Sequence, residues 1–171
     1  VPSRCIGADH ERVSIMSNGD KATATVVVGV DGSEQSVRAL LWAAEEAKLR
    51  GTSLHAVQAW QPLGGAWASP AGAAPASAWS HEDYVAETLS SLDEFVSATL
   101  TDYADVHVRK SVGVGNPVEV LIHTAEQDDA QMLVVGSRGQ GGFKRLLLGS
   151  VSEQCATHAH CPVVIIHPEP K

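Results

Sequence analysis

The sequence predicts a three-layer, Rossmann-like α/β fold in which a five-stranded parallel sheet carries helices on both faces. Continuous apolar runs alternate along the chain with segments whose apolar residues recur at helical spacing. This alternation is typical of parallel sheets, because a helix must return the chain to the same edge before the next parallel strand begins. The crossovers are expected to be right-handed. A chain of 171 residues is also long enough to bury a core within one domain.

The first elements are two strands separated by a helix. Thr25–Val30 is continuously apolar and β-branched, which is typical of a strand buried on both faces. Ser33 is placed to cap the helix that follows, and Gly51 is placed to end it. Thr52–Trp60 is predicted to be the second strand. The apolar residues of the helix recur on one side: Val37, Leu40, Leu41, Ala44 and Ala47.

Two stretches outside this alternation are expected to lack regular structure. Residues 1–22 are polar and aperiodic, without the apolar segment of a secretory signal, and we expect a disordered extension there. The folded domain is expected to span residues 23–168. Within it, residues 61–80 carry no charge and consist mainly of Ala, Gly, Pro and Ser, with Trp67 and Trp79 among them. This composition predicts a long mobile loop.

A second helix and a third strand follow this loop. The helix is expected to start near Ser80, and its apolar residues recur at spacings of four and three. Val106–Val112 alternates between apolar and polar residues, which predicts a half-exposed strand at the edge of the sheet. "GNPVEV" then begins the third helix, with Asn116 as the N-cap, Pro117 at the first helical position and Glu119 reaching back. The stripe of the second helix comprises Val85, Leu89, Leu92, Val96, Leu100 and Tyr103.

The remaining elements are two strands and a short helix. Gln131–Val135 is a fully apolar strand, Ser150–Ala159 is the helix, and Cys161–His167 is the last strand. Ligands of such folds bind beyond the carboxyl ends of the strands, where the winding of the sheet reverses. Asp31 after the first strand and Gly136 after the fourth would face one crevice if these two strands are neighbours.

The segment from Gly136 to Ser152 has the composition of an anion-binding loop. It contains three cations (Arg138, Lys144 and Arg145) and no acid, although the chain has a formal charge of -8. It lacks the Lys-Ser/Thr pair of a Walker A loop, and it does not follow the first strand as a dinucleotide fingerprint does. Its pattern is G-x2-G-x9-G-S, formed by Gly136, Gly139, Gly149 and Ser150.

Two interpretations of this pattern remain open from the residues alone. Glycines let backbone N–H groups approach an anion, and a helix that begins at Gly149–Ser150 offers N–H groups without helical partners. Alternatively, Ser150 and Glu153 form a capping box, which requires no ligand.

Four segments of the chain resemble the universal stress protein family: "VVVGVDGSEQS", "GNPVEVLI", "DDAQMLVVGSRGQGGFKRLLLGSVSEQ" and "CPVVII". The resemblance extends from about Thr23 to His167, and the G-x2-G-x9-G-[ST] motif is typical of the members that bind ATP. It implies the strand order 3-2-1-4-5. It also implies an adenine nucleotide as ligand: ATP, accompanied by Mg²⁺, with AMP and cyclic AMP as alternatives.

The resemblance further assigns roles to the residues around the expected crevice. Asp31 would contact adenine and ribose beside the backbone of Gly29 and Val30, and Ala59 would meet the adenine. Family members often have proline in place of Gly29, and we expect this difference to matter little. They often have histidine in place of Arg138, and the fixed charge of Arg138 should favour a charged nucleotide. The residues that would line the ribose and phosphates are Val135, Gly136, Arg138, Gly139, Gly149, Ser150, Val151 and Ser152.

The function implied is that of a stress-response sensor or switch with little or no catalysis. Hydrolysis of ATP is expected to be slow, because neither a general base nor a pair of Mg²⁺-binding carboxylates is evident. One alternative is a dimeric interaction module whose site is vestigial. Another is an adenylating or ATP-hydrolysing enzyme, although "DGSEQS" after the first strand lacks the paired glycines of adenylating pyrophosphatases.

The last strand is predicted to form a homodimer. At the edge of a 3-2-1-4-5 sheet, the continuously apolar run Val163, Val164, Ile165 and Ile166 would be open to solvent, and a second subunit could pair with it. The acidic balance argues against nucleic acid and anionic membranes as partners. Three cysteines and the lack of an apolar membrane-spanning run fit a cytoplasmic protein.

Two other patterns carry no predicted site. "CATHAHC" gathers Cys155, His158, His160 and Cys161, but we favour buried cysteines and helix-end histidines over a zinc site. No Ser-His-Asp arrangement is identifiable from spacing, and His55 is expected to be an ordinary strand residue, like Gln58.

Overall fold

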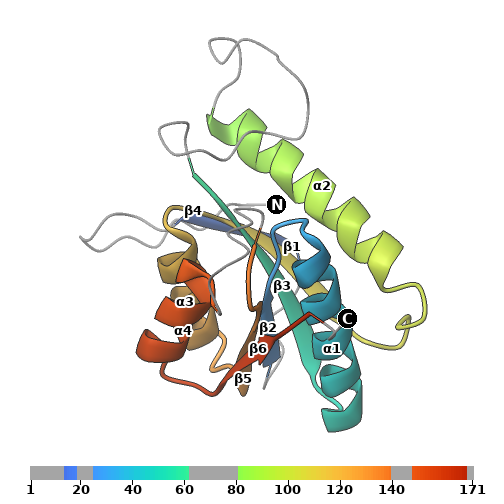
Figure 1. Cartoon of the computed structure of the whole chain (residues 1–171). Coiled ribbons are helices and arrows are strands. Elements are labelled where there is room, and N and C mark those ends of the chain that lie inside the picture. The colour runs from blue at the N-terminus through green and yellow to red at the C-terminus, as the bar shows by residue number, and fades with distance from the viewer. Residues whose placement is uncertain (1–13, 19–24, 62–80, 140–147, 169–171) are drawn as a thin grey trace.

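The computed structural model describes residues 14–18, 25–61, 81–139 and 148–168. These residues form a six-stranded sheet in the order β1-β4-β3-β2-β5-β6 (Figure 1). The strands β2 to β6 are parallel, and their order is the 3-2-1-4-5 that the family resemblance implied. The strands are β1 (Ser14–Asn18), β2 (Thr25–Gly29), β3 (Ser53–Trp60), β4 (Val108–Val114), β5 (Met132–Gly136) and β6 (Val163–Ile166).

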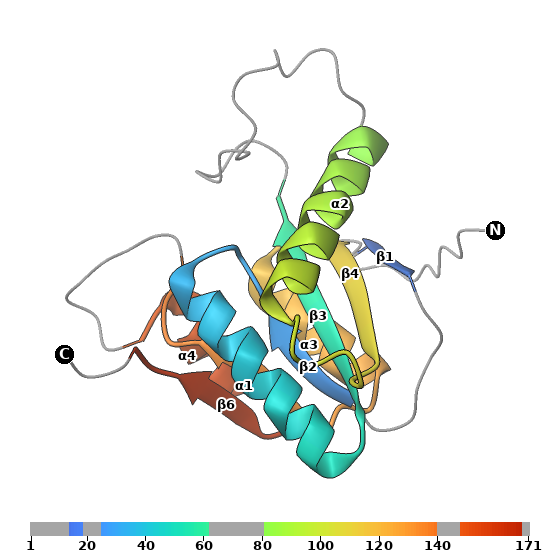
Figure 2. The ribbon, with the colours of Figure 1, turned by 90° about the vertical axis from the view of Figure 1, so that its right-hand side faces the viewer.

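The helices cover both faces of the sheet, as the three-layer prediction required. Figure 2 shows α1 and α2 in front of the sheet and α3 and α4 behind it. None of these described helices combines the length and apolar character that crossing a bilayer requires. The helices are α1 (Glu34–Arg50), α2 (His81–Thr99), α3 (Pro117–Gln127) and α4 (Ser150–His158).

The predicted helix boundaries at α1 and α3 are confirmed by their caps. The Ser33 hydroxyl accepts a hydrogen bond from the Ser36 N–H at 3.2 Å, and Gly51 ends α1 in the left-handed conformation, with φ of 63°. At α3 the Asn116 side chain accepts from the Val118 N–H at 2.9 Å, with Pro117 at the first helical position. These side chains therefore determine where both helices begin.

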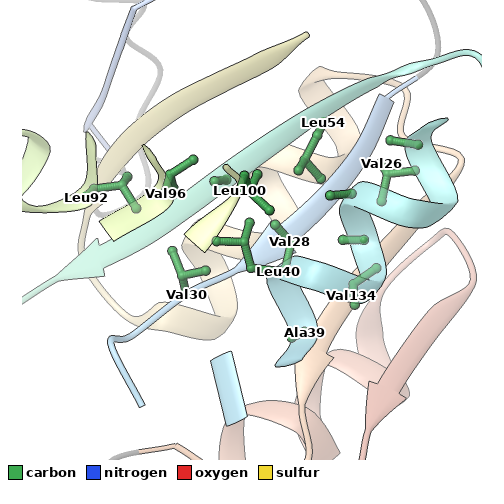
Figure 3. Packing of buried hydrophobic residues seen from close by; sticks show 14 of the residues in the cluster. Val26, Val28, Val30, Ala39, Leu40, Leu54, Leu92, Val96, Leu100 and Val134 are labelled. Atoms are coloured by element: carbon green, nitrogen blue, oxygen red, sulfur yellow. The ribbon is translucent and has the colours of Figure 1, made fainter. Parts of the chain in front are cut away.

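The core consists of two apolar layers, one on each side of the sheet. Val26, Val28 and Val134 point toward α1 and α2, where they meet Leu40 and Leu92 (Figure 3). The alternate residues of the same strands pack against α3 and α4 on the other side, and this second layer includes Val27, Leu133, Leu121 and Cys155. Because each central strand is buried on both faces, its sequence is continuously apolar, as predicted.

The prediction of disorder over residues 1–22 is wrong for Ser14–Asn18, which form β1. This strand pairs antiparallel with β4, from Ser14 opposite Val114 to Asn18 opposite Lys110. As a consequence β4 is not the edge of the described sheet, contrary to the prediction from its alternating pattern. The hydrogen bonds between two strands are made by backbone groups. A segment as short as Ser14–Asn18 can therefore pair with β4 without the periodic apolar residues by which a strand is predicted. The rest of the predicted extension and residues 62–80 of the predicted loop lie outside the described residues.

Candidate functional site

A cavity of about 400 Å³ lies at the carboxyl ends of the central strands. β2 pairs with β5 on one side and with β3 on the other, so the winding of the sheet reverses between β2 and β5. The expectation that Asp31 and Gly136 face one crevice is therefore confirmed. All the residues to which the resemblance assigned a role line this cavity: Gly29, Val30, Asp31, Ala59, Val135, Gly136, Arg138, Gly139, Gly149, Ser150, Val151 and Ser152.

One end of the cavity is formed by the loop after β5 and the first turn of α4. The Gly149 N–H donates to the Ser137 carbonyl at 2.7 Å, and the Ser152 hydroxyl donates to the same carbonyl at 3.0 Å. The Ser152 hydroxyl also lies 3.0 Å from the Gly149 carbonyl. These bonds fix the start of α4 against the glycine loop, so both are presented to the cavity as one unit.

The N-terminus of α4 is not closed by a side chain. Its N-cap is Gly149, which makes no side-chain cap hydrogen bond, and Ser150 is the first helical residue. The alternative of a capping box between Ser150 and Glu153 is therefore wrong. The first helical hydrogen bond is donated by the Glu153 N–H, and the preceding N–H groups have no helical acceptor. These N–H groups and the helix dipole favour an anion in the cavity.

Arg138 adds a full positive charge at the same end. Its side chain lines the cavity, and its Nε atom is buried without a hydrogen-bond partner among the described residues. A buried guanidinium donor without an acceptor costs free energy, so native structures rarely leave one unsatisfied. The arrangement therefore suits an anionic ligand group that accepts from Arg138.

The other end of the cavity combines one carboxylate with apolar walls. Asp31 is oriented by the Ser33 N–H, which donates to Oδ1 at 3.0 Å. The backbone of Gly139 lies directly against this carboxylate, because a Cβ added at Gly139 would overlap Asp31 Oδ2. The side chains of Ala59 and Val135 form part of the apolar wall. This end thus offers a hydrogen-bond acceptor beside a surface for an apolar or aromatic group.

Gly29 has a role here that its sequence context did not reveal. A Cβ at this position would lie 2.9 Å from Leu121 Cδ1, so the glycine allows α3 to approach β2 closely. A residue with a Cβ in its place would therefore require the Leu121 side chain to shift. Leu121 and Pro117 of α3 also line the cavity, and the sequence analysis missed both, because it assigned Pro117 only to the helix start. The other lining residues missed were Ser36, Val57, Gln61 and Leu148.

A serine, a histidine and an aspartate meet away from this cavity, in an arrangement that spacing along the chain did not identify. His55 Nε2 lies 2.7 Å from Ser111 Oγ, and His55 Nδ1 lies 2.6 Å from Asp128 Oδ2. Arg109 forms an ion pair with the same carboxylate and lies 3.0 Å from His55 Nδ1. We call these four side chains the His55 network. Its members come from β3, from β4 and from the C-cap of α3, so no short spacing relates them.

The His55 network is not accessible to a substrate. Ser111 is fully buried and His55 is 2% exposed, so the serine cannot act as a nucleophile on a molecule from solvent. Burial lowers the pKa of His55, and the nearby Arg109 lowers it further, against the opposing effect of Asp128. Burial alone would raise the pKa of Asp128, but the hydrogen bonds from His55 and Arg109 outweigh it and lower that pKa. His55 therefore lies within β3 as expected, but its part in a buried polar network was not predicted.

The "CATHAHC" segment buries Cys155 and leaves Cys161 partly exposed. Burial raises the pKa of the Cys155 thiol to about 11, and burial also raises the pKa of Cys161. His160 instead faces Glu126, with its Nδ1 atom 3.5 Å from a carboxylate oxygen. Within the described ranges no three His, Cys, Asp or Glu side chains gather in a metal-binding arrangement.

Comparison with known proteins identifies relatives over most of the chain. The model of the universal stress protein family matches residues 23–167. A universal stress protein of Mycolicibacterium smegmatis is 36% identical over 143 residues, which are 84% of this chain and 45% of the relative. The chain spans about half the length of the curated relatives it matches.

Solved structures share the fold over nearly their whole length. A universal stress protein in complex with cAMP is 28% identical, with a TM-score of 0.62 over 85% of this chain and 98% of the other. A universal stress protein of Archaeoglobus fulgidus in complex with dAMP is 26% identical, with a TM-score of 0.57 over 84% and 97% of the two chains. A family member from Arabidopsis thaliana with AMP bound is 26% identical, with a TM-score of 0.53 over 85% and 92%.

Proposed function

Because the chain belongs to the universal stress protein family, we propose that its cavity binds an adenine nucleotide, with ATP as the ligand. The protein then acts as a sensor or switch in a stress response, with little or no catalysis. The observation that carries this proposal is the joining of an uncapped helix N-terminus, an arginine whose buried Nε atom has no partner among the described residues, and a glycine loop at one end of a single cavity. Three anion-binding features meet there.

The nucleoside fits the opposite end of the cavity. Adenine is flat and largely apolar, and it suits the wall that includes Ala59 and Val135. The Asp31 carboxylate can accept a hydrogen bond from a ribose hydroxyl or from the adenine amino group. The bound nucleotides named for the three similar structures are cAMP, dAMP and AMP, which share adenine, and this supports an adenine nucleotide here.

The choice of ATP rests on charge. The Arg138 guanidinium is a cation, and it adds to the helix dipole of α4. A triphosphate carries more negative charge than AMP or cyclic AMP, so it gains most from these groups. Mg²⁺ would accompany ATP, held chiefly by the phosphates.

The proposal of little catalysis rests on the residues that line the cavity. Among those the structure describes, Asp31 is the one carboxylate, and none is a histidine or lysine. Phosphoryl transfer enzymes usually hold their metal ions and orient the nucleophile with several such groups. Hydrolysis of bound ATP is therefore expected to be slow.

A homodimer through β6 forms a second part of the proposal. β6 lies at the edge of the described sheet, and its four residues are all only partly buried, on both faces. Pairing with the same strand of a second subunit would cover Val163, Val164, Ile165 and Ile166. A cytoplasmic location is proposed as well, because the free thiols of Cys155 and Cys161 suit a reducing compartment.

Titration calorimetry with ATP, AMP and cyclic AMP tests the ligand. The variant Arg138→Gln keeps a polar side chain without charge, and the matched control Arg50→Gln changes an arginine at the far end of α1. We expect Arg138→Gln to weaken ATP binding by about 10- to 100-fold, the loss of one hydrogen bond to a charged group. The control should bind ATP as the unchanged protein does.

The outcome separates the alternatives. No heat of binding with millimolar ATP would favour a vestigial site in a dimeric interaction module. Release of phosphate or pyrophosphate at many turnovers per minute would favour an enzyme.

A further inference from the structure

The His55 network lies at one end of α3, and the candidate nucleotide cavity lies at the other. Asp128 is the C-cap of the helix, whereas Pro117 and Leu121 near its start line the cavity. α3 has 11 residues, so its two ends are about 16 Å apart at 1.5 Å per residue. A rigid helix of this length transmits a displacement of one end to the other.

The hydrogen-bond partners determine the protonation of His55. Nδ1 lies 2.6 Å from a carboxylate oxygen of Asp128, which can only accept, and 3.0 Å from the Arg109 guanidinium, which can only donate. The carboxylate is the nearer partner, and Arg109 donates to the same carboxylate, so Nδ1 carries a proton and donates it to Asp128. Nε2 is then free to accept from the Ser111 hydroxyl at 2.7 Å. Asp128 is neutralised by Arg109, and the network is complete with a neutral imidazole.

A second proton on His55 is disfavoured by this arrangement. It would sit on Nε2, so the fully buried Ser111 hydroxyl would have to turn from donor to acceptor, and the cation would lie 3.0 Å from Arg109. The charged groups that face the imidazole are Asp128 after α3 and Arg109 on β4. On the other side β2 offers Val27, which is apolar, at the register position of His55. One buried carboxylate would then face two cations without solvent.

We propose that the His55 network is a proton-sensitive clasp that holds the C-terminal end of α3 on the sheet only while His55 is neutral. Protonation of His55 releases Asp128, α3 loosens, and Leu121 leaves the position beside Gly29 that shapes the cavity wall. The clasp itself needs no ligand. Its effect on nucleotide affinity, however, rests on the function proposed above.

The sign of the pH dependence follows from burial. In the closed clasp the pKa of His55 lies below its ordinary value of 6.5, to which it returns when the clasp opens. Closure is therefore fully favourable above about pH 6.5 and weakens as the pH falls toward the pKa of the closed state. In this window the opening equilibrium constant rises by as much as tenfold per pH unit. Asp128, whose pKa is lowered from 3.8, does not titrate there.

Amide hydrogen exchange without nucleotide, at pH 7.5, 6.5 and 5.5, tests the clasp. The amide exchange rates in α3 are corrected for the intrinsic pH dependence of hydrogen exchange and are compared with the rates in α1. The variant His55→Gln replaces the imidazole by a neutral amide that can donate to Asp128 and accept from Ser111. The matched control His107→Gln changes an exposed histidine that directly precedes β4.

We expect α3 of the unchanged protein and of the control to open about fivefold more at pH 5.5 than at pH 6.5, with α1 unaffected. His55→Gln should abolish this difference. Equal exchange of α3 at both pH values in the unchanged protein would overturn the proposal, and so would an unaltered pH dependence in His55→Gln. The measurement on the unchanged protein decides the matter even if His55→Gln does not fold.

Calorimetry with ATP then tests the coupling. ATP affinity should fall between pH 6.5 and 5.5 in parallel with the opening of α3, and His55→Gln should remove that additional fall. If ATP fails to bind at pH 7.5, the proposed function is wrong while the exchange result for the clasp still stands. If ATP binds equally at pH 6.5 and 5.5 although α3 opens, the coupling to the cavity is wrong.

Discussion

Replacing Gly139 by alanine tests the contact between the glycine loop and Asp31. The added Cβ would overlap Asp31 Oδ2, so the carboxylate must move away. Gly139 is itself exposed, and the fold should remain intact. The carboxylate then loses the Ser33 N–H that orients it at 3.0 Å, together with its position for the ligand. A hydrogen bond to a charged group contributes about 1.5–3 kcal/mol, so ATP affinity should fall by roughly 10- to 100-fold.

A double-mutant cycle measured by calorimetry separates this mechanism from a direct effect on the ligand. Asp31→Ala removes the side chain that the new Cβ would displace. In that background Gly139→Ala should change ATP affinity by less than about twofold, because the two substitutions share one cause. A full loss of affinity on adding Gly139→Ala to Asp31→Ala would refute the reasoning, as would unchanged affinity in the single variant.

Three further substitutions have expected outcomes. Asp31→Asn should weaken ATP binding by about 1–2 kcal/mol, because one hydrogen bond to the nucleotide loses its charge. Slow hydrolysis per bound ATP should persist, and a loss of turnover at saturating ATP would instead favour an enzyme. Ile165→Asp should shift a dimer toward monomer in light scattering, and a monomer before the substitution would contradict the proposed interface. Gly29→Ala should lower the free energy of unfolding by about 1–3 kcal/mol in urea titrations, because its Cβ would lie 2.9 Å from Leu121 Cδ1. An unchanged urea midpoint would show that Leu121 and α3 shift to accommodate the Cβ without loss of stability.

The central strands of the sheet were predictable from the apolar pattern of the chain, whereas their order was implied by the family resemblance. Strands buried on both faces must be apolar throughout, and Thr25–Val30 and Gln131–Val135 have that pattern. The glycines of the cavity were predictable for a related reason, whereas the roles of the other predicted lining residues were implied by the family resemblance. The loop after β5 needs close backbone contacts that glycine permits, and Gly139 against Asp31 is one of them. Such local constraints leave a signal in the sequence.

Features that depend on distant side chains were not predictable. His55 and Asp128 are 73 positions apart, and the register of β3 with β4 is what brings Arg109 and Ser111 to the same place. The contact between Gly29 and Leu121 could not be predicted either, because it depends on how α3 packs against β2. These contacts depend on the tertiary arrangement, to which periodicity and spacing are insensitive.

The pairing of β1 with β4 has a practical consequence for anyone who trims this protein. The family similarity begins at residue 23, so a fragment cut to that boundary would lose Ser14–Asn18. β4 would then present a row of unsatisfied N–H and C=O groups from Val108 to Val114. Such a fragment is a candidate for association with other chains during purification, although it retains every residue of the candidate nucleotide cavity. The segment that matches the family is therefore shorter than the segment that keeps β4 paired in the folded protein.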